Sequence, residues 1–108
     1  MDVKTLKNGD MIEVIHDEVH IRMGKEAHCF QIADIAKLAI LTTDQGPVVD
    51  DMALLVVAKE TFFIVPSENA VYEKFLFDGI APKIPIDFQK VIEASSCSEN
   101  AEFVLYTK

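Results

Sequence analysis

The sequence predicts an α+β fold, with an antiparallel sheet of about six to seven strands and two helices packed on one face. Two observations predict this class. Short apolar segments separated by turn residues fill the first two thirds of the chain, which is typical of strands. Two segments with apolar residues at helical spacing then follow Ser67 and Asp87. With 108 residues, the chain is expected to form a single α+β domain, residues 1–108.

The segment Met11–Met23 is predicted to form a hairpin with Asp17 and Glu18 in its turn. In that register Glu13 faces Arg22 across the two strands, which is a favourable pair of opposite charges. The apolar residues that share the inner face are Ile12, Val14, Val19, Ile21 and Met23.

The next segments are predicted to be two strands joined by a break. Gly24–Glu26 is expected to be a turn, and His28–Ile32 alternates apolar and polar residues as a short strand does. Asp34–Ala36 is expected to break or bulge the strand, and Lys37–Thr43 has the apolar and β-branched content of another strand. A helix over residues 32–41 is the competing interpretation of the same apolar spacing.

A second hairpin is predicted from Met52–Ala58 and Thr61–Pro66, with its turn at Lys59–Glu60. The loop before it, residues 44–51, is rich in Asp, Gly and Pro. Both strands are apolar on both faces, as in central strands that are covered on each side. Helices would cover one side, and either a second subunit, as in a homodimer, or the first hairpin would cover the other.

Two helices and a last strand complete the prediction. Ser67 is expected to cap the first helix and Gly79 to end it. Its apolar stripe consists of Val71, Phe75 and Leu76. Asp87 is expected to cap the second helix, whose apolar face carries Phe88, Val91 and Ile92. The chain then forms a strand over Glu99–Tyr106.

Charge limits the classes of partner. Ten Lys and Arg against 18 Asp and Glu give a net charge of −8, which disfavours nucleic acid and anionic membrane surfaces and favours a basic protein. No apolar run reaches the roughly 18 residues that span a bilayer, and no signal peptide is recognised, so we expect a cytoplasmic protein. Cys29 and Cys97 are expected to be free thiols.

The residues that could carry chemistry are His16, His20, His28 and Cys29. The predicted hairpin places His16 and His20 on opposite faces, and their spacing matches no recurrent zinc motif. His28 and Cys29 are neighbours on a strand, so their side chains point to opposite faces and cannot form a nucleophile–base pair. We therefore expect no metal, no cofactor and no enzymatic activity.

Acidic residues concentrate in the predicted loops and turns. Asp17 and Glu18 occupy the first hairpin turn, and Asp44, Asp50 and Asp51 lie in the loop before the second hairpin. Acidic loops on a rigid sheet would steer a cationic partner and orient it. These five residues are the predicted partner-binding residues.

Residues 42–106 resemble a family of short, mostly uncharacterised bacterial proteins. The segments that carry the resemblance are Thr42–Pro47, Val49–Asp51, Ile64–Pro66, Phe75 and Leu76, Ile84–Phe88, Val91–Ala94 and Ser98–Phe103. The general profile, small and acidic without catalytic motifs, is also similar to immunity proteins, which neutralise toxins of contact-dependent growth inhibition systems. The likeness implies a binding protein that blocks the basic cleft of a toxin, for example a nuclease.

Two further hypotheses use other surfaces. A stand-alone adaptor would bind a peptide or a cellular protein through a sheet edge, for which the first hairpin, with Ile15 and His20 on its outer face, is the candidate. An enzyme would use the neighbourhood of His16, His20, His28 and Cys29, with zinc as its metal, and the absence of a recognised ligand spacing argues against it.

Overall fold

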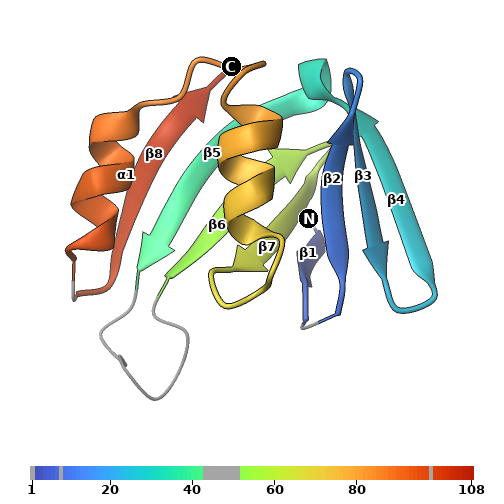
Figure 1. Ribbon diagram of the computed structural model, residues 1–108, viewed down its shortest axis with the longest axis horizontal. Coiled ribbons are helices and arrows are strands. Elements are labelled where there is room, and N and C mark those ends of the chain that lie inside the picture. The colour runs from blue at the N-terminus through green and yellow to red at the C-terminus, as the bar shows by residue number, and fades with distance from the viewer. Residues whose placement is uncertain (1, 8, 43–51, 98) are drawn as a thin grey trace.

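The structure, a computed structural model, describes residues 2–7, 9–42, 52–97 and 99–108. Within these residues the fold is α+β, with eight strands (Figure 1). The strands are β1 (Asp2–Thr5), β2 (Met11–Ile15), β3 (Glu18–Met23), β4 (Glu26–Gln31), β5 (Ile35–Thr42), β6 (Met52–Ala58), β7 (Thr61–Pro66) and β8 (Ala101–Thr107). The helical segments are the 3₁₀ turn η1 (Ile32–Asp34), the π-helix η3 (Lys74–Ile80) and α1 (Phe88–Ser95). None of these helical segments is long and apolar enough to cross a membrane.

The strands form two sheets, which corrects the prediction of a single antiparallel one. The larger sheet has the order β1-β7-β6-β5-β8 and is mixed, because β1 runs parallel to β7. The smaller sheet, β2-β3-β4, is antiparallel. The chain leaves the smaller sheet at η1, where the Asp34 carboxylate accepts a hydrogen bond from the Gln31 backbone N–H at 3.0 Å. This turn redirects the chain into β5. The predicted break before β5 is therefore confirmed, but it begins at residue 32 and not at residue 34, and it separates two sheets.

The first hairpin keeps its predicted inner face but not its register. Ile12, Val19 and Ile21 are at most 2% exposed, as the alternation predicts. The turn consists of residues 16 and 17, one residue earlier than expected, so Glu13 faces His20 and not Arg22. The shift is possible because His16 adopts a φ of 56°, which a tight two-residue turn requires.

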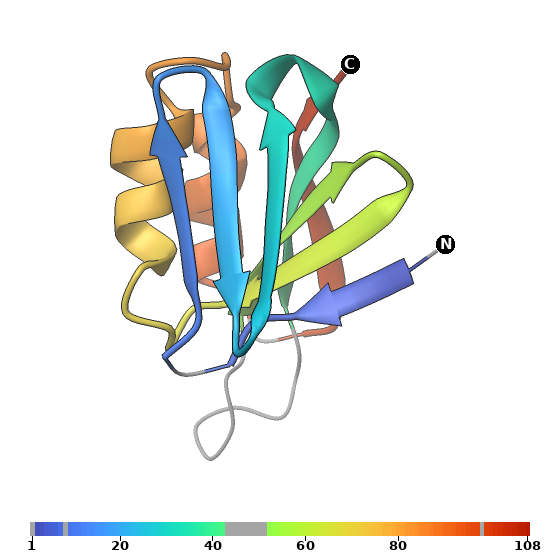
Figure 2. The same cartoon turned by 90° about the vertical axis from the view of Figure 1, so that its right-hand side faces the viewer.

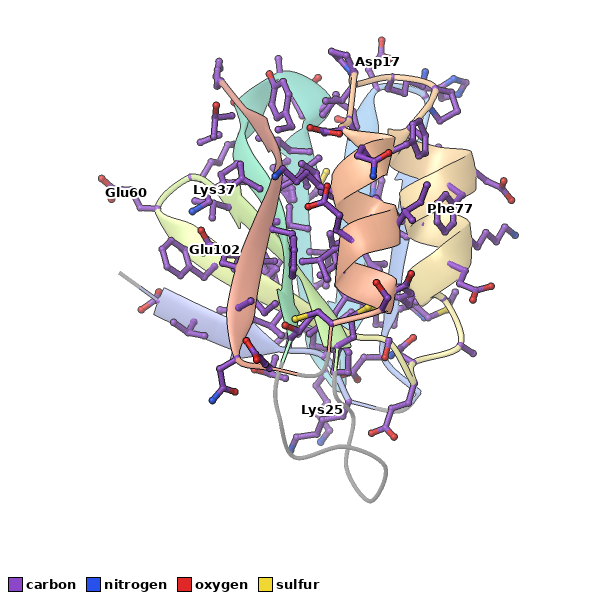
Figure 3. All side chains as sticks on the ribbon, turned by 90° about the vertical axis from the view of Figure 1, so that its left-hand side faces the viewer. Asp17, Lys25, Lys37, Glu60, Phe77 and Glu102 are labelled. Atoms are coloured by element: carbon purple, nitrogen blue, oxygen red, sulfur yellow. The ribbon has the colours of Figure 1, made fainter. Side chains whose placement is uncertain are left out.

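The second hairpin is confirmed with its predicted bounds and turn. Lys59 and Glu60 both take positive φ, 49° and 64°, as the two central residues of a type I′ turn do. The helices and the smaller sheet lie on one side of the larger sheet (Figures 1 and 3). Lys37 and Glu102 lie on the other side, where no other described segment covers the sheet, and their side chains are 2.9 Å apart.

The first helix starts later than predicted. Residues 67–71 form turns, and helical structure begins at Tyr72. The reason is Asn69, a buried polar residue whose amide N–H groups donate to the carbonyl oxygens of Lys7 at 2.9 Å and Asp10 at 3.3 Å. Its side-chain oxygen accepts from the Val71 N–H at 2.9 Å, so this stretch is held as a turn.

Gly79 lies inside η3 and does not end the helix, contrary to the prediction. A Cβ atom at this position would be 2.9 Å from Cγ2 of Val14 on β2. Glycine is therefore required because the helix and the smaller sheet approach closely here. The close contact fixes η3 beside β2 and closes one side of the core.

The second helix is confirmed, but its apolar face is only partly buried. The Asp87 carboxylate accepts from the N–H groups of Gln89 and Lys90, as predicted for an N-cap. Ala94 is the helix residue that is buried, whereas Phe88 is 49% and Ile92 is 62% exposed. The two helices lie side by side on the same face of the larger sheet (Figure 3).

Candidate functional site

Two of the five predicted acidic residues, Asp17 and Glu18, lie within the part of the chain that the structure describes. Asp17 lies in the exposed turn between β2 and β3, and its Oδ1 is 3.1 Å from Nζ of Lys83. Glu18 belongs to β3 and not to the turn. Asp44, Asp50 and Asp51 lie outside the described residues. The end of β5 and the start of β6 lie at the opposite end of the molecule from the β2–β3 turn (Figures 1 and 2).

The outer face of the smaller sheet is turned toward the viewer in Figure 2. The strand register places several polar side chains on this face. We call it the hairpin face. It consists of Met11, Glu13, Ile15, Glu18, His20, Arg22, Ala27, Cys29 and Gln31. A shallow cavity of about 430 Å³ is lined in part by Glu13, His20 and Cys29.

Within the hairpin face, Glu18, His20 and Cys29 are close together. His20 and Cys29 are partners across β3 and β4, and Glu18 is two residues from His20 on the same face. Nε2 of His20 is 3.4 Å from Oε1 of Glu18 and 3.9 Å from Sγ of Cys29. The sequence analysis considered zinc near His20 and Cys29 but placed Glu18 in a turn, so it did not place Glu18 on the same face. The register shift of the hairpin is what moves Glu18 onto the sheet.

The other two histidines are not part of this cluster. His16 occupies the β2–β3 turn. His28 packs with its ring edge against Phe63, with 5.6 Å between ring centroids. Its Nε2 is buried and has no hydrogen-bond partner among the described residues. His28 therefore belongs to the packing between the sheets, which separates it from its sequence neighbour Cys29.

A second feature is an exposed aromatic surface on the two helices. Phe77 of η3 and Phe88 of α1 stack with 6.4 Å between ring centroids and an interplanar angle of 11°. They are 42% and 49% exposed, and Ile92 is 62% exposed. We call these three residues the aromatic helix face. Sequence reasoning missed it because Phe88 and Ile92 were assigned to the apolar face of the second helix, which predicts burial, and Phe77 was assigned to no face.

A cavity of about 230 Å³ lies between β2 and η3. Its apolar lining includes Val14, Val71 and Phe75, and its charged lining consists of Glu13, Lys74 and Asp78. Asp78 follows Phe77 directly, so η3 contributes to both the cavity and the aromatic helix face. Apolar and acidic groups are thus combined on this side of the molecule.

Comparison of the chain with protein-family models, with curated proteins and with solved structures finds no match. The functional argument therefore rests on two surfaces of the described residues. One is the aromatic helix face with its acidic neighbours, and the other is the hairpin face with its Glu18, His20 and Cys29 cluster.

Proposed function

We propose that the protein is a non-enzymatic binding protein of the cytoplasm whose partner is a basic protein. In its most concrete form it is an immunity protein that binds and neutralises a cognate toxin domain. The observation that carries the proposal is the aromatic helix face on a chain with a net charge of −8. Apolar recognition and electrostatic attraction would both act on the same partner.

The aromatic helix face has the composition of a protein-binding surface. Half-exposed Phe77 and Phe88 leave apolar area in contact with water, which a partner would remove. Aromatic anchors at the centre of an interface commonly supply most of its binding energy. The stacking of the two rings holds them in one orientation, so little conformational freedom is lost on binding.

The charge of the chain supports a basic partner. Five lysines of the described residues lie within 4.0 Å of a carboxylate oxygen, so much of the positive charge is neutralised within the fold. The exposed acids Glu73 and Asp78 adjoin the aromatic helix face along the chain. An uncompensated negative field raises the association rate with a cationic protein and makes it sensitive to salt.

The test begins with the tagged protein expressed in its native cells and purified at low and then at moderate salt. We expect one basic protein to co-purify and to be lost at high salt. The isolated pair is then measured with wild type, with F77S/F88S and with V104S, a control that changes an exposed apolar residue of β8. Binding should weaken about 100-fold or more in F77S/F88S, in line with the loss of two interface anchors, and stay unchanged in V104S.

Protection of cells from the partner, when it is a toxin, should be lost with the same double variant. Recovery of the protein alone, or with an acidic partner, would overturn the proposed function. Unchanged binding by F77S/F88S would exclude the aromatic helix face. The charge-reversing variant D50K/D51K then tests the acidic loop, where slower association is expected if that loop contacts the partner.

A second candidate is an adaptor that binds a peptide. It is favoured by the cavity between β2 and η3, because β2 is an edge strand of the smaller sheet. Such an adaptor would bind its peptide without protecting cells from any toxin, and M11A, which changes an exposed residue of the cavity, would weaken peptide binding.

A further inference from the structure

We infer that Glu18, His20 and Cys29 of the hairpin face form a binding site for Zn²⁺. The site goes beyond the proposed function, because it lies on a different surface from the aromatic helix face. Its three side chains supply an oxygen, a nitrogen and a sulfur ligand, which is a combination that zinc accepts in proteins. Each ligand atom lies within 4.8 Å of the other two.

The backbone explains why these three residues meet. The tight turn at Gly24 and Lys25 sets the register of β3 and β4, which places His20 directly opposite Cys29. Side chains two residues apart on a strand point to the same face, so Glu18 stands beside His20. The site is therefore built on two paired strands and depends on no loop.

The spacing of the ligand atoms suits a shared cation. His20 Nε2 is 3.4 Å from Glu18 Oε1, which is longer than the roughly 2.7–3.2 Å of an N–H···O hydrogen bond. A tetrahedral zinc ion with bonds of about 2.0–2.1 Å to N and O and about 2.3 Å to S separates N from O by about 3.3 Å and N from S by about 3.6 Å. The 3.9 Å between His20 Nε2 and Cys29 Sγ is close to the second value.

Gln31 orients the carboxylate. Its Nε2 donates a hydrogen bond to Oε2 of Glu18 at 3.1 Å, which leaves Oε1 on the side of His20. Partners of this kind fix the orientation of metal ligands and contribute to affinity. Gln31 is the cross-strand partner of Glu18, so the same register that forms the cluster also supplies this support.

Three protein ligands leave a fourth tetrahedral position for water or another ligand. The site opens onto the cavity of about 430 Å³ that His20 and Cys29 help to line, so an ion can enter from solvent. Cys29 is a free, exposed thiol, and zinc binds cysteine in proteins through its sulfur. Glu13, the partner of His20 on β2, lines the same cavity.

The experiment uses the full-length protein, freed of metal with a chelator under reducing conditions. Zn²⁺ is titrated against a chromophoric competitor, and Co²⁺ is used as a spectroscopic probe of the ligands. We expect one Zn²⁺ per chain with micromolar or tighter affinity. The Co²⁺ form should show a thiolate charge-transfer band and the intense visible bands of a tetrahedral ion.

Matched variants assign the ligands. E18Q, H20A and C29S should each weaken Zn²⁺ binding more than tenfold, and C29S should also abolish the thiolate band. Q31A should weaken binding about 10-fold, as expected for a residue that orients a ligand. C97S and H16N change the other free cysteine and a turn histidine, and neither should change affinity.

Two results would overturn the site: a wild-type affinity that C29S and H20A leave unchanged, or a Co²⁺ form without a thiolate band. Circular dichroism of each variant checks that it is folded. Because the three ligands lie on the outer face of the sheet, the variants are expected to fold, and the wild type should gain thermal stability with Zn²⁺ where C29S does not. Failure of this test would leave the binding of a basic partner unaffected.

Discussion

The two hairpins of the molecule, β2–β3 and β6–β7, differ in what their second face does. Both bury one apolar face in the same core. The second face of β2–β3 is polar and holds Glu18 and His20, whereas the second face of β6–β7 is apolar and includes Leu55, which is 5% exposed. The second faces of both hairpins lie outside the core, so the difference is one of composition: β2–β3 presents polar side chains that can bind an ion, whereas β6–β7 presents apolar side chains that pack on one another.

The largest expected effect is a loss of stability when a buried residue of the β6–β7 hairpin is truncated. L54A removes a fully buried side chain from the centre of β6 and should lower the free energy of unfolding by about 2–5 kcal/mol, because a cavity is left behind. Urea unfolding measures the change. The matched variant I15A, at a 43% exposed position of the hairpin face, should cost less than about 1 kcal/mol. Equal costs for the two variants would contradict the comparison.

The next effect concerns the contact that holds β2–β3 against the helices. G79A should destabilise by about 1–2 kcal/mol, because the new methyl group meets Val14 at 2.9 Å and the overpacking exceeds the gain in helix propensity. In a V14A background the same substitution should become stabilising, because only the propensity gain of up to about 1 kcal/mol remains. A double-mutant cycle by urea unfolding reports this change of sign. If the unfolding free-energy changes of G79A and V14A simply added in the double variant, the contact between residues 79 and 14 would not be the cause of the destabilisation.

The two turns provide a smaller effect of opposite sign. K59N/E60G should stabilise by about 0.5–1 kcal/mol, because Asn and Gly adopt the positive φ of residues 59 and 60 with less strain. Thermal unfolding measures the gain. The corresponding change H16N in the first hairpin relieves a single residue and should give a smaller gain. A loss of stability in K59N/E60G would contradict the assigned turn.

The smallest effect lies on the hairpin face. H20A, measured in the presence of a chelator, should change the free energy of unfolding by less than about 0.5 kcal/mol, since His20 packs outside the core. Urea unfolding in saturating Zn²⁺ should then separate the two proteins, with wild type the more stable. A large decrease in the free energy of unfolding of H20A in the presence of a chelator would show that His20 stabilises the fold without a metal ion.

The local pattern of the sequence predicts much of this fold. The alternation in β2 and β3 predicts which residues are buried, and the two apolar runs predict β6, β7 and their turn. The register of the first hairpin could not be predicted, because its turn lacks the glycine that would mark it and depends on the φ of His16. The pairing of β1 with β7 and the contact of Gly79 with Val14 join distant segments, which local patterns do not encode.

The candidate sites were less accessible to sequence reasoning. The pairing of His20 with Cys29 follows from the register of β3 and β4, and Glu18 joins them only when the turn is displaced by one residue. The stack of Phe77 and Phe88 joins two separate helices, and Phe88 is exposed although the apolar face of its helix was expected to be buried. Both features depend on tertiary structure, namely the register of β3 and β4 and the contact between η3 and α1. A charge count or a motif search does not predict either of them.

The parallel pairing of β1 has a consequence for the order in which the molecule assembles. Asp2 pairs with Thr61 and Thr5 with Ile64, so β1 is synthesised before its partner strand and has no partner until β7 emerges from the ribosome. Once β7 forms, β1 covers the backbone edge next to Phe62 and Ile64, which would otherwise be open to pairing with another chain. β1 thus protects this edge of the larger sheet from the moment the edge exists, and chains in which β1 is detached are the ones most prone to aggregate through β7.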